Sequence, residues 1–254
     1  MKSARAAAHV HSSWSYDAQW SLRDIASAFR RRRYDVVLMA EHDRSFDEHK
    51  WADYRLACQE ASTDGILLVP GIEYEDSDGV VHIPVWGDQV PFLGAGRPTL
   101  EVLRCARAAN AIAVLAHPWR RDAISRYRPE WGGLLSAIEI WNRKYDGVAP
   151  SRQLRQFADR ENVEPFVSLD FHNRHQFFPL AMSITLAGEP SPAAVVEAIR
   201  DGHCRPEFLG GPALRFTEGV AGAALRVLER ARRGVRRPIH RPQQADRPPV
   251  NAGR

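Results

Sequence analysis

The sequence predicts an α/β protein, and more specifically a distorted (β/α)7 TIM-like barrel with a metal site at the carboxyl ends of its strands. Two observations support this, together with a general property of barrels. Short apolar runs alternate with segments of helical periodicity roughly seven times along the 254 residues, which is typical of a parallel sheet with helical crossovers. Histidines and carboxylates recur where the apolar runs end. In barrels, functional residues gather at that face.

The first half of the chain supplies four predicted strands and two helices. The strands are short apolar runs, most of them continuous as expected when both faces are buried, and Ser21 is a typical N-cap. In order, we expect a strand ending at His9 and His11, a helix from Ser21 to Arg33, a strand over 34–40, a helix over 46–62, a strand over 66–69 that continues to Glu73, a turn over 76–79 and a strand over 80–86 carrying His82.

The second half continues the alternation. We expect a helix over 98–109, a strand over 111–116 ending in His117, a strand over 137–141 carrying Glu139, a helix over 151–162, a strand over 165–169 ending in Asp170, a strand over 180–186, a helix over 192–201 closed by Gly202, and a last helix over 220–233. Glycine after a helix is a common terminator because it adopts the left-handed conformation.

The charge is unevenly distributed between body and C-terminus. From Val220 onward, nine arginines face Glu229 and Asp246, a net charge of +7, so the first 219 residues carry −3 of the total of +4. We expect a barrel domain over 1–212, a helix over 213–234 packed on or beside it, and a disordered basic tail over 235–254. Such a tail can contact nucleic acid, but it has no aromatic residue to stack on bases.

Composition argues against a membrane protein. No apolar run approaches the roughly 18 residues that a membrane span needs, and no signal peptide precedes His9. Cys58, Cys105 and Cys204 are far apart and form no C-x-x-C motif, which favours free thiols in a reducing compartment. We therefore expect a cytoplasmic protein with no membrane partner, and the oligomeric state stays open.

The polar residues at the strand ends are the chemical types that bind divalent metals. Two histidines separated by one residue, such as His9 and His11, point to the same side of a strand. Imidazoles and carboxylates without thiolates suit Zn²⁺, Mn²⁺ or Fe²⁺. A carboxylate can bridge two such ions, and two metals about 3.5–4 Å apart can activate one water for attack on phosphorus.

The order of these residues resembles that of a known family, the PHP (polymerase and histidinol phosphatase) metal-dependent phosphoesterases. The resemblance covers residues 5–210 and implies a distorted seven-stranded barrel. Ala7 stands where members often carry aspartate, and Glu41 replaces the first aspartate of a common Thr-Asp-His-Asp. The matching elements are His9-x-His11-Ser12, Tyr16-Asp17, Glu41-His42-Asp43, Glu73, His82, Ala116-His117-Pro118 and Asp170-x-His172.

This resemblance implies two or three metal ions and assigns ligands to them. One metal would be held by His9, His11, Glu73 and Asp170, a second by Glu73 as a bridge with His82 and His117, and a third by Asp17, His42 and His172. Among these, His117, Asp170 and His172 are the expected catalytic residues. The implied reaction is hydrolysis of a phosphomonoester or a small nucleotide by a metal-bound hydroxide.

Cationic and aromatic residues near the strand ends are candidates for substrate binding. Arg120, Arg143 and Arg174 follow strands that end near the predicted metals, and guanidinium groups suit phosphate. Trp14, Trp119 and Trp141 can stack on a base or form a pocket wall. Three alternative roles fit Glu139: a hydrogen-bond partner of a metal ligand, a general acid, or a structural hydrogen-bond acceptor.

Three alternative functions stay open at this point. A nuclease that trims short oligonucleotides would use the same site. A non-catalytic barrel that binds nucleic acid or protein is disfavoured by the near-complete ligand set. A hydrolase of C–N bonds would normally need a lysine ligand at a strand end, and none of Lys2, Lys50 and Lys144 is expected there.

Overall fold

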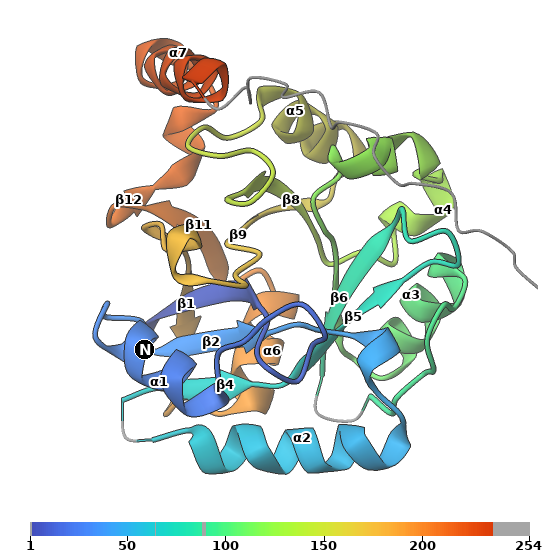
Figure 1. Cartoon of the computed structure of the whole chain (residues 1–254). Coiled ribbons are helices and arrows are strands. Elements are labelled where there is room, and N and C mark those ends of the chain that lie inside the picture. The colour runs from blue at the N-terminus through green and yellow to red at the C-terminus, as the bar shows by residue number, and fades with distance from the viewer. Residues whose placement is uncertain (1, 64, 88–89, 236–254) are drawn as a thin grey trace, which may run out of the picture.

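The computed structural model describes residues 2–63, 65–87 and 90–235, and in these ranges two six-stranded sheets form the framework (Figure 1). The first sheet has the order β12-β11-β10-β1-β2-β4, with β1 Lys2–Val10, β2 Val36–Met39, β4 Leu67–Val69, β10 Leu180–Leu186, β11 Cys204–Phe208 and β12 Gly211–Pro212. The second has the order β3-β5-β6-β7-β8-β9, with β3 Glu41–His42, β5 Gly71–Glu75, β6 His82–Trp86, β7 Ile112–Leu115, β8 Ala137–Asn142 and β9 Glu164–Ser168.

The mixed α/β class is as predicted, but the described strands do not close into the expected (β/α)7 barrel. Strand β1 pairs antiparallel with β10, and β6 pairs antiparallel with both β5 and β7. The cause is the shortness of some connections. A turn joins β5 to β6 through Asp76 and Gly79 with no helix, and a strand that returns through so short a link must run antiparallel.

The two sheets meet where β2 and β4 lead into β3 and β5, and where the end of β1 lies beside the end of β9. Only Ala40 separates β2 from β3, and only Pro70 separates β4 from β5. On the other side, the N–H groups of Leu169 and Phe171, just after β9, donate to the carbonyls of Ala8 and His9 at 3.0 and 2.9 Å. Segments that lie far apart in the sequence therefore bring their polar residues to one place.

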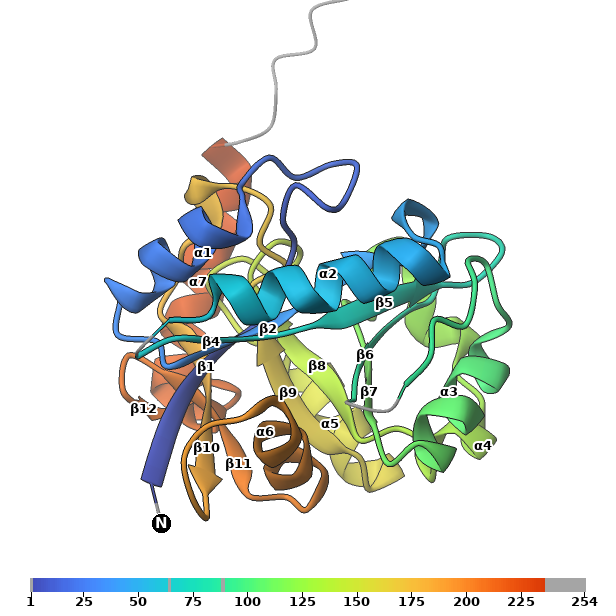
Figure 2. The same cartoon turned by 90° about the horizontal axis from the view of Figure 1, so that it is seen from below.

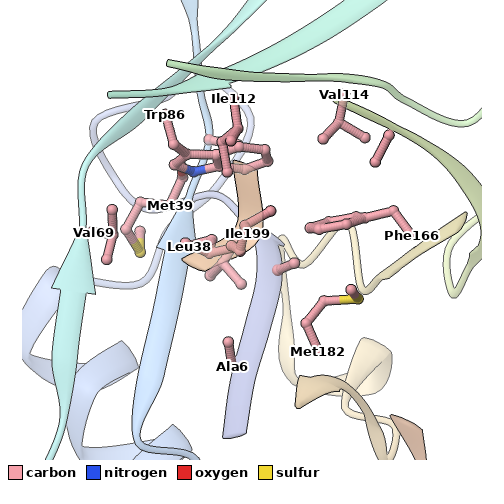
Figure 3. Packing of buried hydrophobic residues seen from close by; sticks show 14 of the residues in the cluster. Ala6, Leu38, Met39, Val69, Trp86, Ile112, Val114, Phe166, Met182 and Ile199 are labelled. Carbon is pink, nitrogen blue, oxygen red and sulfur yellow. The ribbon is translucent and has the colours of Figure 1, made fainter. Parts of the chain in front are cut away.

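The hydrophobic core lies between the two sheets and contains large side chains from both (Figure 3). Leu38, Met39, Trp86 and Phe166 are fully buried. The indole N–H of Trp86 donates to the Met39 carbonyl, which satisfies this polar group inside the core. Burial of each such side chain stabilises the fold by about 1.5–3 kcal/mol, so the core holds the strand ends in fixed positions.

Helices cover the outer faces of the sheets, as Figure 2 shows for α2 along β4. The α-helices are α1 Leu22–Arg30, α2 Glu48–Ala61, α3 Thr99–Ala108, α4 Pro129–Gly132, α5 Arg152–Glu161, α6 Pro192–Arg200 and α7 Gly219–Val235, and the 3₁₀ helices are η1 Asp43–Ser45, η2 Arg120–Arg126, η3 Arg174–Gln176 and η4 Ala213–Phe216. Ser21 caps α1 as predicted, but the helix ends at Arg30 rather than Arg33. Within the described ranges, no helix has both the length and the apolar character needed to cross a bilayer.

The C-terminal helix α7 is held by polar contacts. Glu229 is buried, and its carboxylate accepts a hydrogen bond from the Val148 N–H at 3.0 Å. Arg232 and Arg233 pair with the same carboxylate. The apolar residues Val220, Val227 and Leu228 are exposed, and residues 236–254 of the predicted tail lie outside the described part of the chain.

Candidate metal centre

The structure brings the nine predicted metal ligands into one cluster at the junction of the two sheets. Eight of the nine are buried, and Asp17 keeps 35% of its side chain exposed. They lie on β1, β3, β5 and β6, in the segments just after β7 and β9, and in the loop after β1. The cluster consists of His9, His11, Asp17, His42, Glu73, His82, His117, Asp170 and His172.

Glu73 lies at the centre of the cluster with 1% of its side chain exposed. Its Oε1 atom lies 3.1 Å from His9 Nε2, 2.9 Å from His82 Nδ1 and 3.0 Å from His117 Nε2. Its Oε2 atom lies 3.2 Å from His42 Nδ1. A carboxylate whose two oxygens face different groups of imidazoles has the arrangement that a bridging ligand needs.

The aspartates occupy the other side of the cluster. Asp170 Oδ1 lies 3.7 Å from His11 Nε2, and its Oδ2 lies 3.8 Å from His117 Nε2. Asp17 Oδ2 lies 3.0 Å from His172 Nε2, and its Oδ1 lies 3.4 Å from His42 Nε2. Asp17 therefore reaches the cluster from the loop after β1.

Glu75 also belongs to the cluster, although the sequence analysis did not include it. Its Oε1 atom lies 3.1 Å from His42 Nδ1, and its Oε2 atom lies 3.9 Å from His82 Nε2. The signal for it was present in the sequence, because Glu73 and Glu75 are two residues apart on β5 and side chains two apart share a strand face. Glu75 adds a fourth carboxylate beside the imidazoles.

Four groups of side chains have the spacing of metal sites. In each group the candidate ligand atoms lie within 4.8 Å of one another. The groups are His11, Asp17, His42 and His172; His9, His11 and Asp170; His9, Glu73 and His117; and His42, Glu75 and His82. The first matches the predicted third metal with His11 added, and the last pairs His82 with Glu75.

Several ligand atoms in the cluster lack hydrogen bonds, which fits a metal site. Within the described residues, buried atoms without a hydrogen-bond partner include His9 Nε2, His11 Nε2, both His42 nitrogens and Asp170 Oδ2. An unsatisfied buried polar group costs about 1–3 kcal/mol, so many of them in one place need an explanation. Divalent cations bound to these imidazole nitrogens and carboxylate oxygens would satisfy them.

Buried hydrogen bonds from neighbouring residues orient the predicted ligands. Glu139 is fully buried and accepts from His9 Nδ1 at 2.9 Å, from the His117 N–H at 2.7 Å and from Asn142 Nδ2 at 2.7 Å. Of the three roles considered for Glu139, this arrangement favours a partner of metal ligands. Glu41 accepts from the hydroxyls of Ser12 and Ser15 and so fixes the loop after β1.

Burial and charge shift the pKa values of these groups in opposite directions. Burial and the neighbouring His172 and His42 put the pKa of His11 well below its ordinary value. Burial acts the same way on His9, but Glu73, Asp170 and Glu139 outweigh it and raise the pKa of His9. Burial favours protonation of Glu73, but the His9 and His82 charges outweigh it and keep its pKa well below the usual range. The central carboxylate is therefore ionised at neutral pH.

Of the three predicted phosphate-binding arginines, only Arg120 lines the hollow at the cluster, which has a volume of about 110 Å³. Its Nη1 atom lies 2.9 Å from His82 Nε2 and donates to the Gly79 carbonyl. The Arg143 guanidinium lies over the Phe178 ring, and Arg174 is exposed on η3. Neither of these two lines the hollow.

Lys144 also lies at the cluster, beside two of the predicted ligands. Its Nζ atom lies 3.2 Å from Asp170 Oδ1 and 3.3 Å from His172 Nε2. The lysine follows the end of β8 by two residues, and its contact with Asp170 places this loop beside the cluster. Burial opposes its charge, but Asp170 outweighs burial and raises the pKa of Lys144, which keeps it cationic.

Comparison with known proteins identifies the fold. No protein-family model and no curated protein matches the sequence. Similar solved structures include a two-domain protein containing a predicted PHP-like metal-dependent phosphoesterase from Bacteroides vulgatus ATCC 8482, with 18% identity and a TM-score of 0.62 over 82% of this chain and 65% of that one. PsfC from Pseudomonas syringae PB-5123 has 14% identity and a TM-score of 0.62 over 92% and 99% of the two chains.

The novel lesion-specific endonuclease PfuEndoQ from Pyrococcus furiosus has 15% identity and a TM-score of 0.52 over 80% of this chain and 56% of its own. The chain thus spans less than two thirds of the Bacteroides protein and of the endonuclease. At these sequence identities, the similarity shows a shared fold alone. The chain has the fold of PHP-like metal-dependent phosphoesterases, which confirms at that level the resemblance seen in its sequence motifs.

Proposed function

We propose that this protein is a metal-dependent phosphoesterase that hydrolyses a phosphomonoester or a small nucleotide at a centre of two or three divalent metal ions. The observation that carries the proposal is the buried cluster of imidazoles around Glu73, with the cations of Arg120 and Lys144 at its edge. Fold alone does not assign a reaction. The fold likeness to phosphoesterases and to an endonuclease supports the same class of reaction.

The charges of the cluster suit two or three divalent ions. Asp17, Glu73, Glu75 and Asp170 contribute four negative charges, which two divalent ions balance. A third ion would leave the site positive and therefore attractive to a phosphate dianion. When bound, such metals supply Lewis-acid stabilisation of phosphoryl oxygens and a water that ionises near neutral pH. Imidazole and carboxylate ligands are compatible with manganese, zinc and iron.

The protein's own side chains would position the substrate. Arg120 and Lys144 both line the small hollow, where their cationic groups can bind phosphate oxygens. Tyr145 lines it as well, with its ring centroid 4.8 Å from that of His117. We propose His117, Asp170 and His172 as the catalytic residues, because His117 and Asp170 line this hollow and Asp170 lies 3.8 Å from His117 Nε2 and 3.3 Å from His172 Nδ1.

Hydrolysis by the purified protein tests the proposal. Phosphate release from p-nitrophenyl phosphate would be measured with Mn²⁺, in parallel with cleavage of a 5′-phosphorylated tetranucleotide. His117→Ala and Asp170→Ala are expected to abolish turnover while keeping the wild-type circular dichroism spectrum. His49→Ala, which removes an exposed histidine of α2, is the matched control and should remain active. Full activity of either site variant would refute the proposal.

The two substrates also separate the proposed phosphatase from a nuclease. Inorganic phosphate from the monoester alone would support a phosphatase. Release of mononucleotides from the tetranucleotide would support a nuclease, for which the fold likeness to a lesion-specific endonuclease provides an argument. Metal binding without turnover of either substrate would support a non-catalytic binding protein instead.

A further inference from the structure

A groove beside the metal centre has a lining that the proposed reaction does not use. It lies between α7 and the loops that follow β7 and β8 and has a volume of about 440 Å³. Its lining combines one tryptophan with several arginines and includes Trp119, Asp146, Pro150, Arg226, Arg230 and Arg233. Aromatic and cationic side chains in one groove are the combination that binds single-stranded nucleic acids.

The groove and the metal hollow share a wall. Trp119 lines the groove, and the next residue, Arg120, lines the metal hollow. In the same way, Asp146 lines the groove while Tyr145 lines the hollow. Since consecutive residues of these two loops line the two spaces, a ligand with one phosphate at the metal centre can continue past the loops into the groove.

The groove is positively charged, and part of this charge is not neutralised by the protein. Arg230 is exposed and has neither a hydrogen bond nor an ion pair with any other described residue. Arg226 uses Nη1 to donate to the Thr217 carbonyl at 2.9 Å and keeps further N–H groups. Glu229 also lines the groove, but its carboxylate is already paired with Arg232 and Arg233. An anionic ligand is therefore the expected occupant.

Trp119 is held in a position that suits stacking. The residue is 42% exposed although it is large and hydrophobic. Its indole N–H donates to the Ser151 hydroxyl at 3.0 Å, which anchors one edge of the ring. A tryptophan fixed at its edge and open to solvent can accept a base on its face, and such stacking contributes about 1–3 kcal/mol per base.

We propose that this groove binds a short single-stranded nucleic acid, with Trp119 stacking on a base and with Arg226 and Arg230 contacting backbone phosphates. The placement of the nucleic acid's terminal phosphate at the metal centre rests on the proposed function. Binding of the nucleic acid in the groove does not rest on it. The substrate would then be an oligonucleotide rather than a simple monoester. Residues Gly219–Val235 of α7 would form one side of its binding site.

Binding without hydrolysis tests the groove independently of catalysis. A tetrathymidylate labelled at its 3′ end with fluorescein would be titrated with the full chain in EDTA, and binding followed by fluorescence anisotropy. Trp119→Ala is expected to weaken binding about 5- to 150-fold, the equivalent of the stacking contribution. Arg230→Ala is expected to weaken binding and to lower the slope of log affinity against log salt by about one. Thermal unfolding would verify that each variant folds.

Arg104→Ala is the matched control, because Arg104 is an exposed arginine on α3 that does not line the groove. Its affinity should equal that of the wild type. Equal affinity of Trp119→Ala, Arg230→Ala and the wild type, or no binding by the wild type, would overturn the proposal. Failure of the proposed function would appear separately, as absence of Mn²⁺-supported hydrolysis despite groove-dependent binding.

Discussion

Replacing Glu139 with glutamine is expected to weaken metal binding without unfolding the protein. One carboxylate oxygen accepts from His9 Nδ1, and the other accepts from the His117 N–H and from Asn142. A glutamine carbonyl can keep the second pair of bonds, but its amide group then faces His9 Nδ1. The His9 proton must move to Nε2, the atom that lies 3.1 Å from Glu73, and a protonated Nε2 cannot bind a metal.

The size of this effect follows from the role of the hydrogen bond. Loss of a carboxylate that orients a histidine ligand typically costs 10–100-fold in metal affinity, or about 1.4–2.7 kcal/mol. Competition with a chromogenic chelator would measure the affinity of the wild type and of Glu139→Gln for Mn²⁺ and Zn²⁺. Glu207→Gln is the control, because Glu207 pairs with Arg5 on β1 and contacts no cluster residue. Wild-type affinity of Glu139→Gln would refute the reasoning.

Three further predictions concern the helix, the core and the exposed ligand. Burial favours protonation of Glu229, but its arginine partners outweigh burial and lower its pKa from 4.5 to about 2. The stabilisation of the fold by the ionised Glu229 carboxylate should be complete above pH 4.5 and disappear as the pH falls towards 2. The difference in thermal midpoint between wild type and Glu229→Gln should therefore shrink on acidification. Phe166→Ala should lower the free energy of unfolding in urea by about 3–5 kcal/mol, whereas Leu56→Ala, at an exposed position, should change it little. Asp17→Asn should remove one metal equivalent, measured by elemental analysis after dialysis, and unchanged stoichiometry would contradict the assigned site.

The clustering of the site could be predicted because it depends on where strands end. Apolar runs place His42, His117 and Asp170 at or just after the ends of strands, and a core between the sheets holds those ends together. Local patterns such as the Ser21 cap could also be predicted, because capping depends on one side chain and the backbone next to it. These features need only short-range information and the general geometry of packed strands.

The sheet topology and the contact of Lys144 with the cluster could not be predicted in this way. Antiparallel pairing of β1 with β10 joins segments about 180 residues apart, and no local pattern specifies that partner. Lys144 reaches Asp170 because the loop after β8 lies beside the cluster, and loop paths are not contained in hydrophobic periodicity. Glu75 differs from Lys144, because its position two residues after Glu73 on β5 already places both side chains on one face of the strand.

The backbone at the ligands shows where strand-based reasoning reaches its limit. His9, His117 and Asp170 all have positive φ values, of 61°, 28° and 48°, a region that costs non-glycine residues on the order of 1–3 kcal/mol. At His9 the pairing register of β1 with β2 shifts between Ala8 and Val10, so simple alternation does not set the direction of the imidazole. The rings of His9 and His11 still lie 5.1 Å apart. Three ligands from three strands share this unfavourable conformation, which argues that the strand ends are shaped by the cluster they hold rather than by the preferences of the strands.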